Sequence, residues 1–179
     1  KYQDMETGPV CWQQGGVSLT VTPCDAAGVV YTPNLFGATE PESPENGDVW
    51  LKQAEDAPWS YRDALKLYST AGGWQNILLN YCRVTCKGLG EAFKAGDTVT
   101  LTGIPSVVKN AYSSDFSGDV VVDDVAGDSV ILSIAPDIES VLYYGTCVVT
   151  GQSVVWTAMD GKTTQTFDGP FPDVTAQRR

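Results

Sequence analysis

The side chains of this chain that could do chemistry are carboxylates, thiols and hydroxyls, because its 179 residues include no histidine. Without an imidazole base, neither a Ser-His-Asp triad nor a Cys-His pair can form. A Ser–Lys pair is the nucleophilic arrangement that a histidine-free chain still permits. Phosphate-binding glycine loops of the Gly-x-x-x-x-Gly-Lys and Gly-x-Gly-x-x-Gly types are absent from the sequence. These absences favour a protein that is not an enzyme.

Carboxylates are the next candidates, and four of them lie close together: Asp119, Asp123, Asp124 and Asp128. Converging carboxylates bind hard cations or serve as glycosidase acids. Their spacing is not that of a calcium loop. Adjacent residues on a strand point to opposite faces, so Asp123 and Asp124 converge only if the strand bulges. We interpret these residues as solvated charges of turns and strand edges.

The thiols belong to five cysteines, Cys11, Cys24, Cys82, Cys86 and Cys147, an odd number that does not fit a fully paired disulfide framework. Cys82 and Cys86 have a spacing that resembles half of a zinc site, but the sequence has no histidine and no second close cysteine pair. Positions four apart on a strand share a face. We therefore predict buried free thiols in a reducing compartment, with no metal and no cofactor.

Tryptophans are the remaining candidates, because an exposed indole can stack on a sugar or anchor a protein contact. The five are Trp12, Trp50, Trp59, Trp74 and Trp156. Trp50 and Trp74 lie in predicted strands, where core packing is expected. Trp59 follows Pro58 in a predicted loop and is the best exposed candidate. Sugar binding, subunit contact and local packing all remain open for it.

The composition indicates which type of secondary structure carries these residues. Eighteen Gly, ten Pro and short alternating runs are typical of a turn-rich β protein. The net charge of −11 repels nucleic acid and anionic membranes. It is explained either by solubility or by a place in the wall of a channel through which DNA passes without sticking. No run approaches the roughly twenty apolar residues of a membrane span, and no signal peptide is recognisable.

Alternation of apolar and polar residues predicts an all-β fold of two regions. Residues 1–80 are expected to hold an N-terminal arm and a β-meander, with strands near 47–51, 65–68 and 74–79. Residues 17–22 and 29–31 are predicted to pair as a hairpin. Residues 81–179 are expected to form a small barrel- or sandwich-like region with long loops and an extended C-terminal tail. Its strands are predicted near 98–104, 119–125, 129–134, 141–150, 153–158 and 163–167.

Two segments resemble modules of tailed-bacteriophage virion proteins. The first is Gly47-Asp48-Val49-Trp50, then Leu65-Lys66-Leu67-Tyr68, then Gly73-Trp74, which is similar to a β module of phage tail, fibre and neck proteins. The second runs from Phe93 to Ile134, with Gly96-Asp97 before one alternating strand and Gly127-Asp128 before another. It resembles a small β-barrel of phage tail proteins. The usual Asn-Gly before the third strand is absent, and Asp115-Phe116-Ser117-Gly118-Asp119 stands in its place.

The resemblance implies a structural component of a tailed-phage virion, in a tail, neck or fibre attachment. Such a protein would be assembled in the host cytoplasm and would contact copies of itself and portal, tail or fibre subunits, without specific nucleic-acid or membrane binding. The alternatives are a carbohydrate- or receptor-binding module of a fibre or spike, and a capsid decoration protein. The candidate interface residues are Tyr2, Trp12, Trp59, Tyr61, Phe171, Arg178 and Arg179.

Overall fold

The structure is a computed structural model that describes residues 6–11, 18–52, 65–112, 116, 118–137, 140, 142 and 145–178, with the backbone alone for 6–11. It is nearly all β, which confirms the predicted fold class. Two four-residue helices are α1 (Leu89–Ala92) and α2 (Ser106–Lys109). The strands of the first half are β1 (Glu6–Cys11), β2 (Leu19–Cys24), β3 (Leu35–Phe36), β4 (Val49–Leu51), β5 (Leu65–Ser69) and β6 (Gly73–Asn76). They are followed by β7 (Tyr81–Thr85), β8 (Thr98–Thr102), β9 (Asp119–Ala126), β10 (Ser129–Leu132), β11 (Thr146–Val149), β12 (Ser153–Thr157), β13 (Thr164–Asp168) and β14 (Val174–Arg178).

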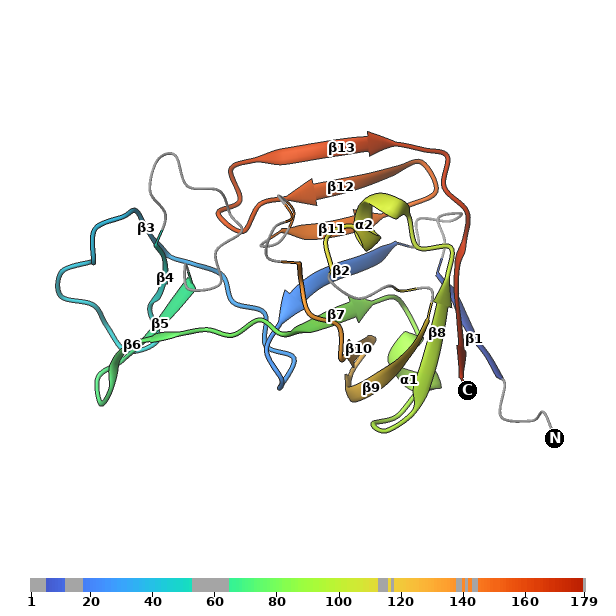
Figure 1. The fold of residues 1–179 in the computed structure, drawn as a ribbon, viewed down its shortest axis with the longest axis horizontal. Helices are drawn as coiled ribbons and strands as arrows, with labels where there is room; N and C mark the ends of the chain where they lie inside the picture. The colour runs from blue at the N-terminus through green and yellow to red at the C-terminus, as the bar shows by residue number, and fades with distance from the viewer. Residues whose placement is uncertain are drawn as a thin grey trace.

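The main body is a ten-stranded sheet with the order β1-β14-β8-β9-β10-β7-β2-β11-β12-β13. Every neighbouring pair in it is antiparallel. In Figure 1, β7, β2, β11, β12 and β13 run across the view, whereas β8, β14 and β1 run nearly at right angles to them. The described strands do not close a barrel, because β1 and β13 remain as the two edges.

One hydrophobic core joins the two halves of this sheet. Core residues alternate along β2, β7, β11 and β12 from one half and along β8, β9 and β14 from the other. Val99 and Leu101 on β8 illustrate the pattern, because both are buried and they lie two residues apart. Side chains of a strand alternate between its two faces, so every second residue points to the covered face. The sheet therefore wraps around its own side chains, which accounts for the sandwich-like character predicted from the sequence.

Strand β10 is buried on both faces, because the loop after β2 covers the face that points away from the core. Ile131 is fully enclosed, and a Cβ added at Gly28 would stand 2.8 Å from its side chain. The guanidinium of Arg83 links the loop to the strand, since Nη1 donates to the Gly28 carbonyl at 2.6 Å and Nε donates to Ser129 Oγ at 3.0 Å. Glycine at position 28 thus allows the loop to approach the sheet closely.

A separate four-stranded sheet, in the order β3-β4-β5-β6, stands away from the main body at the left of Figure 1. The antiparallel pairs β4–β5 and β5–β6 confirm the predicted meander, and β3 adds a parallel strand that was not predicted. The sheet has its own small core, made of Val49, Leu51, Leu65, Ile77 and Leu79.

The structure changes three expectations, which concern the first hairpin, the C-terminal tail and the N-terminal arm. Residues 29–31 form no strand, and β2 pairs instead with β7 and β11, so the predicted hairpin is wrong. The extended C-terminal tail contains strand β14, which lies inside the large sheet between β1 and β8. Part of the predicted N-terminal arm is β1, so the large sheet takes strands from both sides of residue 80.

Candidate functional site

Most of the residues predicted as interface lie outside the described part of the chain; these are Tyr2, Trp12, Trp59, Tyr61 and Arg179. Phe171 is described, half-buried in the connection between β13 and β14, where it packs on the main core. Arg178 ends β14, and its backbone pairs with Val99 on β8 and Glu6 on β1. Because Phe171 precedes β14 and Arg178 closes it, the strand separates the two candidates.

A mostly apolar groove of about 430 Å³ lies between α2 and the β13–β14 connection, and we call it the α2 groove. Its apolar lining comes from Ile104, Pro105, Val107, Phe167, Phe171 and Pro172, and its polar side chains are Ser106 and Lys109. Gly103 at its start has a φ of 86°, and a Cβ there would lie 2.1 Å from the Asp173 carbonyl oxygen. The groove is therefore built where the β8–α2 loop crosses the chain that leads into β14.

Ser106 and Lys109 have the Ser-x-x-Lys spacing of serine–lysine hydrolases, a pattern that the sequence interpretation had not assigned to them. A lysine acts as a base toward serine when it is desolvated and hydrogen-bonded to the hydroxyl. Ser106 is exposed and Lys109 is only half-buried, and no hydrogen bond joins them within the described residues. The pair therefore lacks the enclosure that activates such a nucleophile, and the groove is better suited to receive an apolar side chain.

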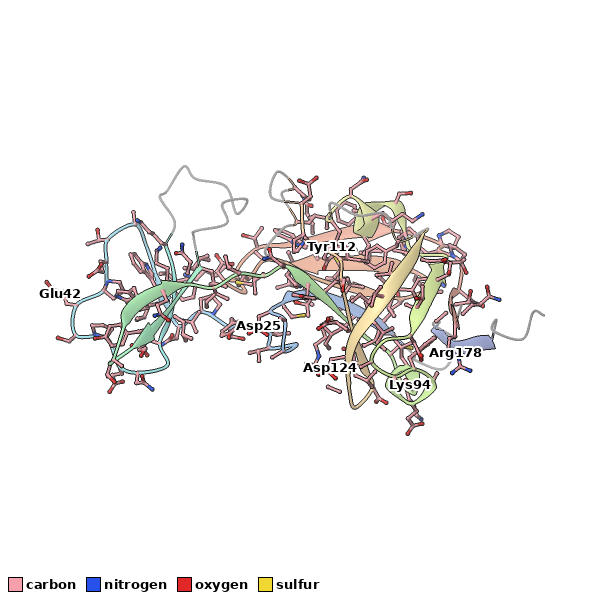
Figure 2. The ribbon with its side chains drawn as sticks, turned by 60° about the horizontal axis from the view of Figure 1, so that its bottom comes forward. Asp25, Glu42, Lys94, Tyr112, Asp124 and Arg178 are labelled. Carbon is pink, nitrogen blue, oxygen red and sulfur yellow. The ribbon has the colours of Figure 1, made fainter. Side chains whose placement is uncertain are left out.

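A second groove of about 440 Å³ lies at the junction of the two sheets, where Figure 2 shows Asp25. The Asp25 carboxylate accepts hydrogen bonds from the Ala27 and Val29 amides at 2.9 Å and from the Tyr31 hydroxyl at 2.8 Å. Burial, and then the hydrogen bond to Asp25, raise the pKa of Tyr31. Leu78, which is 59% exposed, forms part of the wall. The Asp25 carboxylate is occupied by these bonds to the loop, and the other polar side chains of the lining are those of Tyr31, Gln75 and Asn76.

The aspartates singled out by the sequence have structural partners. Asp119 accepts a hydrogen bond from the Thr100 hydroxyl on the neighbouring strand. Asp128 accepts one from the Gly88 amide at 3.0 Å. Within the described residues, no group of three acidic, cysteine or histidine side chains could hold a metal ion.

The interpretation of Asp123 and Asp124 as solvated charges is confirmed, and the strand bulges at this point. Asp124 pairs with Ile131 and Val122 pairs with Leu132, so the register shifts between them. Both aspartates are exposed, rather than divided between a buried and an exposed face. The extra residue bends β9 where the large sheet changes direction, which is a common use of a bulge.

Burial of the thiols is confirmed for Cys24, Cys82, Cys86 and Cys147, which are all enclosed. Burial raises the pKa of Cys147 to about 12, and burial and then the Asp25 charge raise that of Cys24 to about 12. Burial also raises the pKa of Cys82 well above its ordinary range, in spite of a hydrogen bond with Tyr112. Thiols that stay protonated are poor nucleophiles and poor metal ligands, so Cys24, Cys82 and Cys147 act as buried structural side chains.

The aromatic side chains of the small sheet form a tilted cluster on the face opposite its core. The ring of Trp74 lies 5.3 Å from that of Trp50 and 5.1 Å from that of Tyr68, with interplanar angles of 60° and 65°. Trp50 is 2% exposed, and its indole N–H donates to the Gly37 carbonyl at 2.8 Å. The predicted packing role of Trp50 is confirmed. A sugar platform needs exposed and nearly coplanar rings, which this cluster does not offer.

Comparison with known proteins places no constraint on these assignments, because no protein-family model, no curated protein and no solved structure matches the chain. None of the helices in the described part of the chain is long and apolar enough to cross a membrane.

Proposed function

We propose that this protein is a non-enzymatic structural subunit of a tailed-phage virion, which acts through contacts with copies of itself and with other virion proteins. The observation that carries the proposal is the small sheet. The segment whose sequence resembles phage β modules forms its own sheet with its own small core, and Met159 of the β12–β13 turn packs against that core. A small sheet presented in this way gives a neighbouring subunit edges and side chains to bind.

The use of the polar side chains supports the same interpretation. Asp25, Asp119 and Asp128 bind the protein's own loops and strands, and the described thiols are buried. Among the described residues, the large exposed apolar side chains are Phe36 and Val121 on strands and Val29, Val30 and Leu78 in loops. Such residues are available for contacts between proteins, whereas a catalytic cleft would need converging polar groups.

The test is the native mass of the purified chain, measured by light scattering over a concentration series, together with a glycan array. We expect a discrete oligomer whose mass is a multiple of the chain mass, and no glycan binding. A strict monomer that binds a glycan would overturn the proposal in favour of a carbohydrate- or receptor-binding module.

A further inference from the structure

The two sheets of the described residues have four edges, and these differ in how well they are protected against pairing with another strand. Edge strands are usually blunted by shortness, charge, proline or a bulge. Edge strand β1 contains Pro9 and a register shift between Thr7 and Val10. In the small sheet, β3 has two residues, and β6 is a four-residue strand that begins with Gly73.

Strand β13 lacks these protections. It pairs with β12 over five consecutive residue pairs without a register shift, so it is regular over its whole length. Its sequence, Thr164-Gln165-Thr166-Phe167-Asp168, contains no proline and a single charge, which stands at its end. The open side of β13 pairs with no other described strand.

The backbone pattern shows which groups face the open side. The Ala158 amide donates to the Thr163 carbonyl at 2.8 Å, and the Gly169 amide donates to the Gln152 carbonyl at 2.7 Å. Because hydrogen-bonded pairs alternate along an antiparallel ladder, Gln165 and Phe167 also bond toward β12. The amides and carbonyls of the alternate residues, Thr164, Thr166 and Asp168, therefore point outward from the sheet.

We propose that β13 is a self-association edge, at which the β13 strands of two copies pair antiparallel about a twofold axis at Thr166. In this register Thr166 faces Thr166 of the second copy as a hydrogen-bonded pair, and Thr164 faces Asp168. All outward amides and carbonyls of both strands are then satisfied, through about six backbone hydrogen bonds. Threonine pairs across strands are favourable.

The side chains of the same strand fit this occupant. Asp168 faces the Thr164 hydroxyl of the second copy. The Asp168 carboxylates of the two copies therefore do not face each other. Phe167 is half-buried, packs on the main core and lines the α2 groove. Across the axis, the two Phe167 side chains are diagonal neighbours on one face, at a separation of about 7–8 Å that aromatic rings can bridge. The association thus covers an apolar side chain that the single copy leaves partly open.

The inference deepens the proposed function by naming one contact, and disulfide trapping tests its register. In the full-length chain, Thr166→Cys places two thiols on opposite residues whose Cα atoms are about 5.5 Å apart, within the range of a disulfide. Thr164→Cys is the matched control, because its two copies would lie about 14 Å apart along the strands. With copper phenanthroline and oxygen as oxidant, we expect a covalent dimer for Thr166→Cys, and only the wild-type background for Thr164→Cys. Equal cross-linking of both variants, or of neither, overturns the register.

Light scattering then tests the edge itself. Thr166→Lys sets two ammonium groups against each other at the axis and should shift the dimer to monomer. Thr70→Lys, an equal charge change at an exposed turn of the small sheet, should leave the dimer intact. Circular dichroism of both variants separates loss of association from loss of folding. A wild-type monomer, or an oligomer that Thr166→Lys leaves unchanged, overturns the inference. An oligomer that Thr166→Lys leaves unchanged would still agree with the proposed function, because the copies would then associate through other surfaces.

Discussion

The carboxylate of Asp25 and the guanidinium of Arg83 show how single polar residues are used in this protein. Asp25 holds the loop after β2 by accepting bonds from two amides and one hydroxyl. Arg83 bonds the same loop to Ser129 on β10. Both side chains therefore fasten a loop over the outer face of the large sheet. The hydrogen bonds of these two charged groups are made with nearby parts of the protein itself. Their role is therefore structural, and they are not directed at a ligand.

The buried thiols lead to a prediction at the same scale. Burial raises the pKa of Cys147 from its ordinary 9.0 to about 12, so the thiol ionises in the unfolded chain well before it does so in the folded one. Its contribution to stability is complete below pH 9 and is lost as the pH rises toward 12. We expect the stability advantage of wild type over Cys147→Ala to shrink by about 1 kcal/mol per pH unit above pH 9.

Urea unfolding at pH 8, 9 and 10 measures this difference. Val149→Ala is the control, because Val149 lies on the same strand, faces the same core and does not titrate. Its difference from wild type should stay constant over the three pH values. If the Cys147→Ala difference were equally constant, the thiol would be as accessible in the folded protein as in the unfolded chain.

At the scale of elements, the sequence predicted those strands whose alternation and turns are local. Gly47-Asp48 and Gly72-Gly73 delimit β4 and the β5–β6 turn, and this meander was predicted with its pairing. The predicted hairpin of residues 17–22 with 29–31 does not form, because Val29 and Val30 lie in the loop after β2 and remain exposed. Pairing between strands distant in the sequence, such as β2 with β7 and β11, has no local signal.

Strand β14 is the element whose position changes an expectation most, and it gives the second prediction. Ala176 is fully buried and pairs with Leu101, inside the sheet rather than in a tail. Ala176→Asp should therefore cost about 3 kcal/mol or more of unfolding free energy, because it places an unpaired carboxylate in the core. Gln177→Asp, one residue along and half-exposed, should cost less than about 1 kcal/mol. Thermal and urea unfolding of the two variants make the comparison, and equal small effects would mean that β14 is dispensable to the core.

At the scale of the whole molecule, the sheet order decides which surfaces are available, and neither composition nor periodicity could reveal it. A polar strand such as β13 has the same pattern whether it lies inside a sheet or at its edge, because threonine suits both positions. Its edge position follows only from the way the chain returns through the β13–β14 connection to place β14 beside β8. The α2 groove depends on the same return, since Phe167 and Phe171 come from its two sides.

The net charge of −11 opposes any association between copies, and this sets the salt dependence of the proposed dimer. Acidic side chains are spread over the molecule, from Glu42 on the small sheet to Asp124 on the large one (Figure 2). Two copies therefore repel each other over distances that salt screens, whereas the β13 contact itself is made by backbone groups, threonines and Phe167. We expect the dissociation constant to fall by about tenfold between about 0.02 and 0.5 M NaCl, as measured by sedimentation equilibrium. KCl at the same ionic strength should act equally, because the effect is screening and not the binding of one ion. Association that weakened with salt would require opposite charges to meet at the interface, and β13, with a single aspartate and no basic residue, cannot supply them.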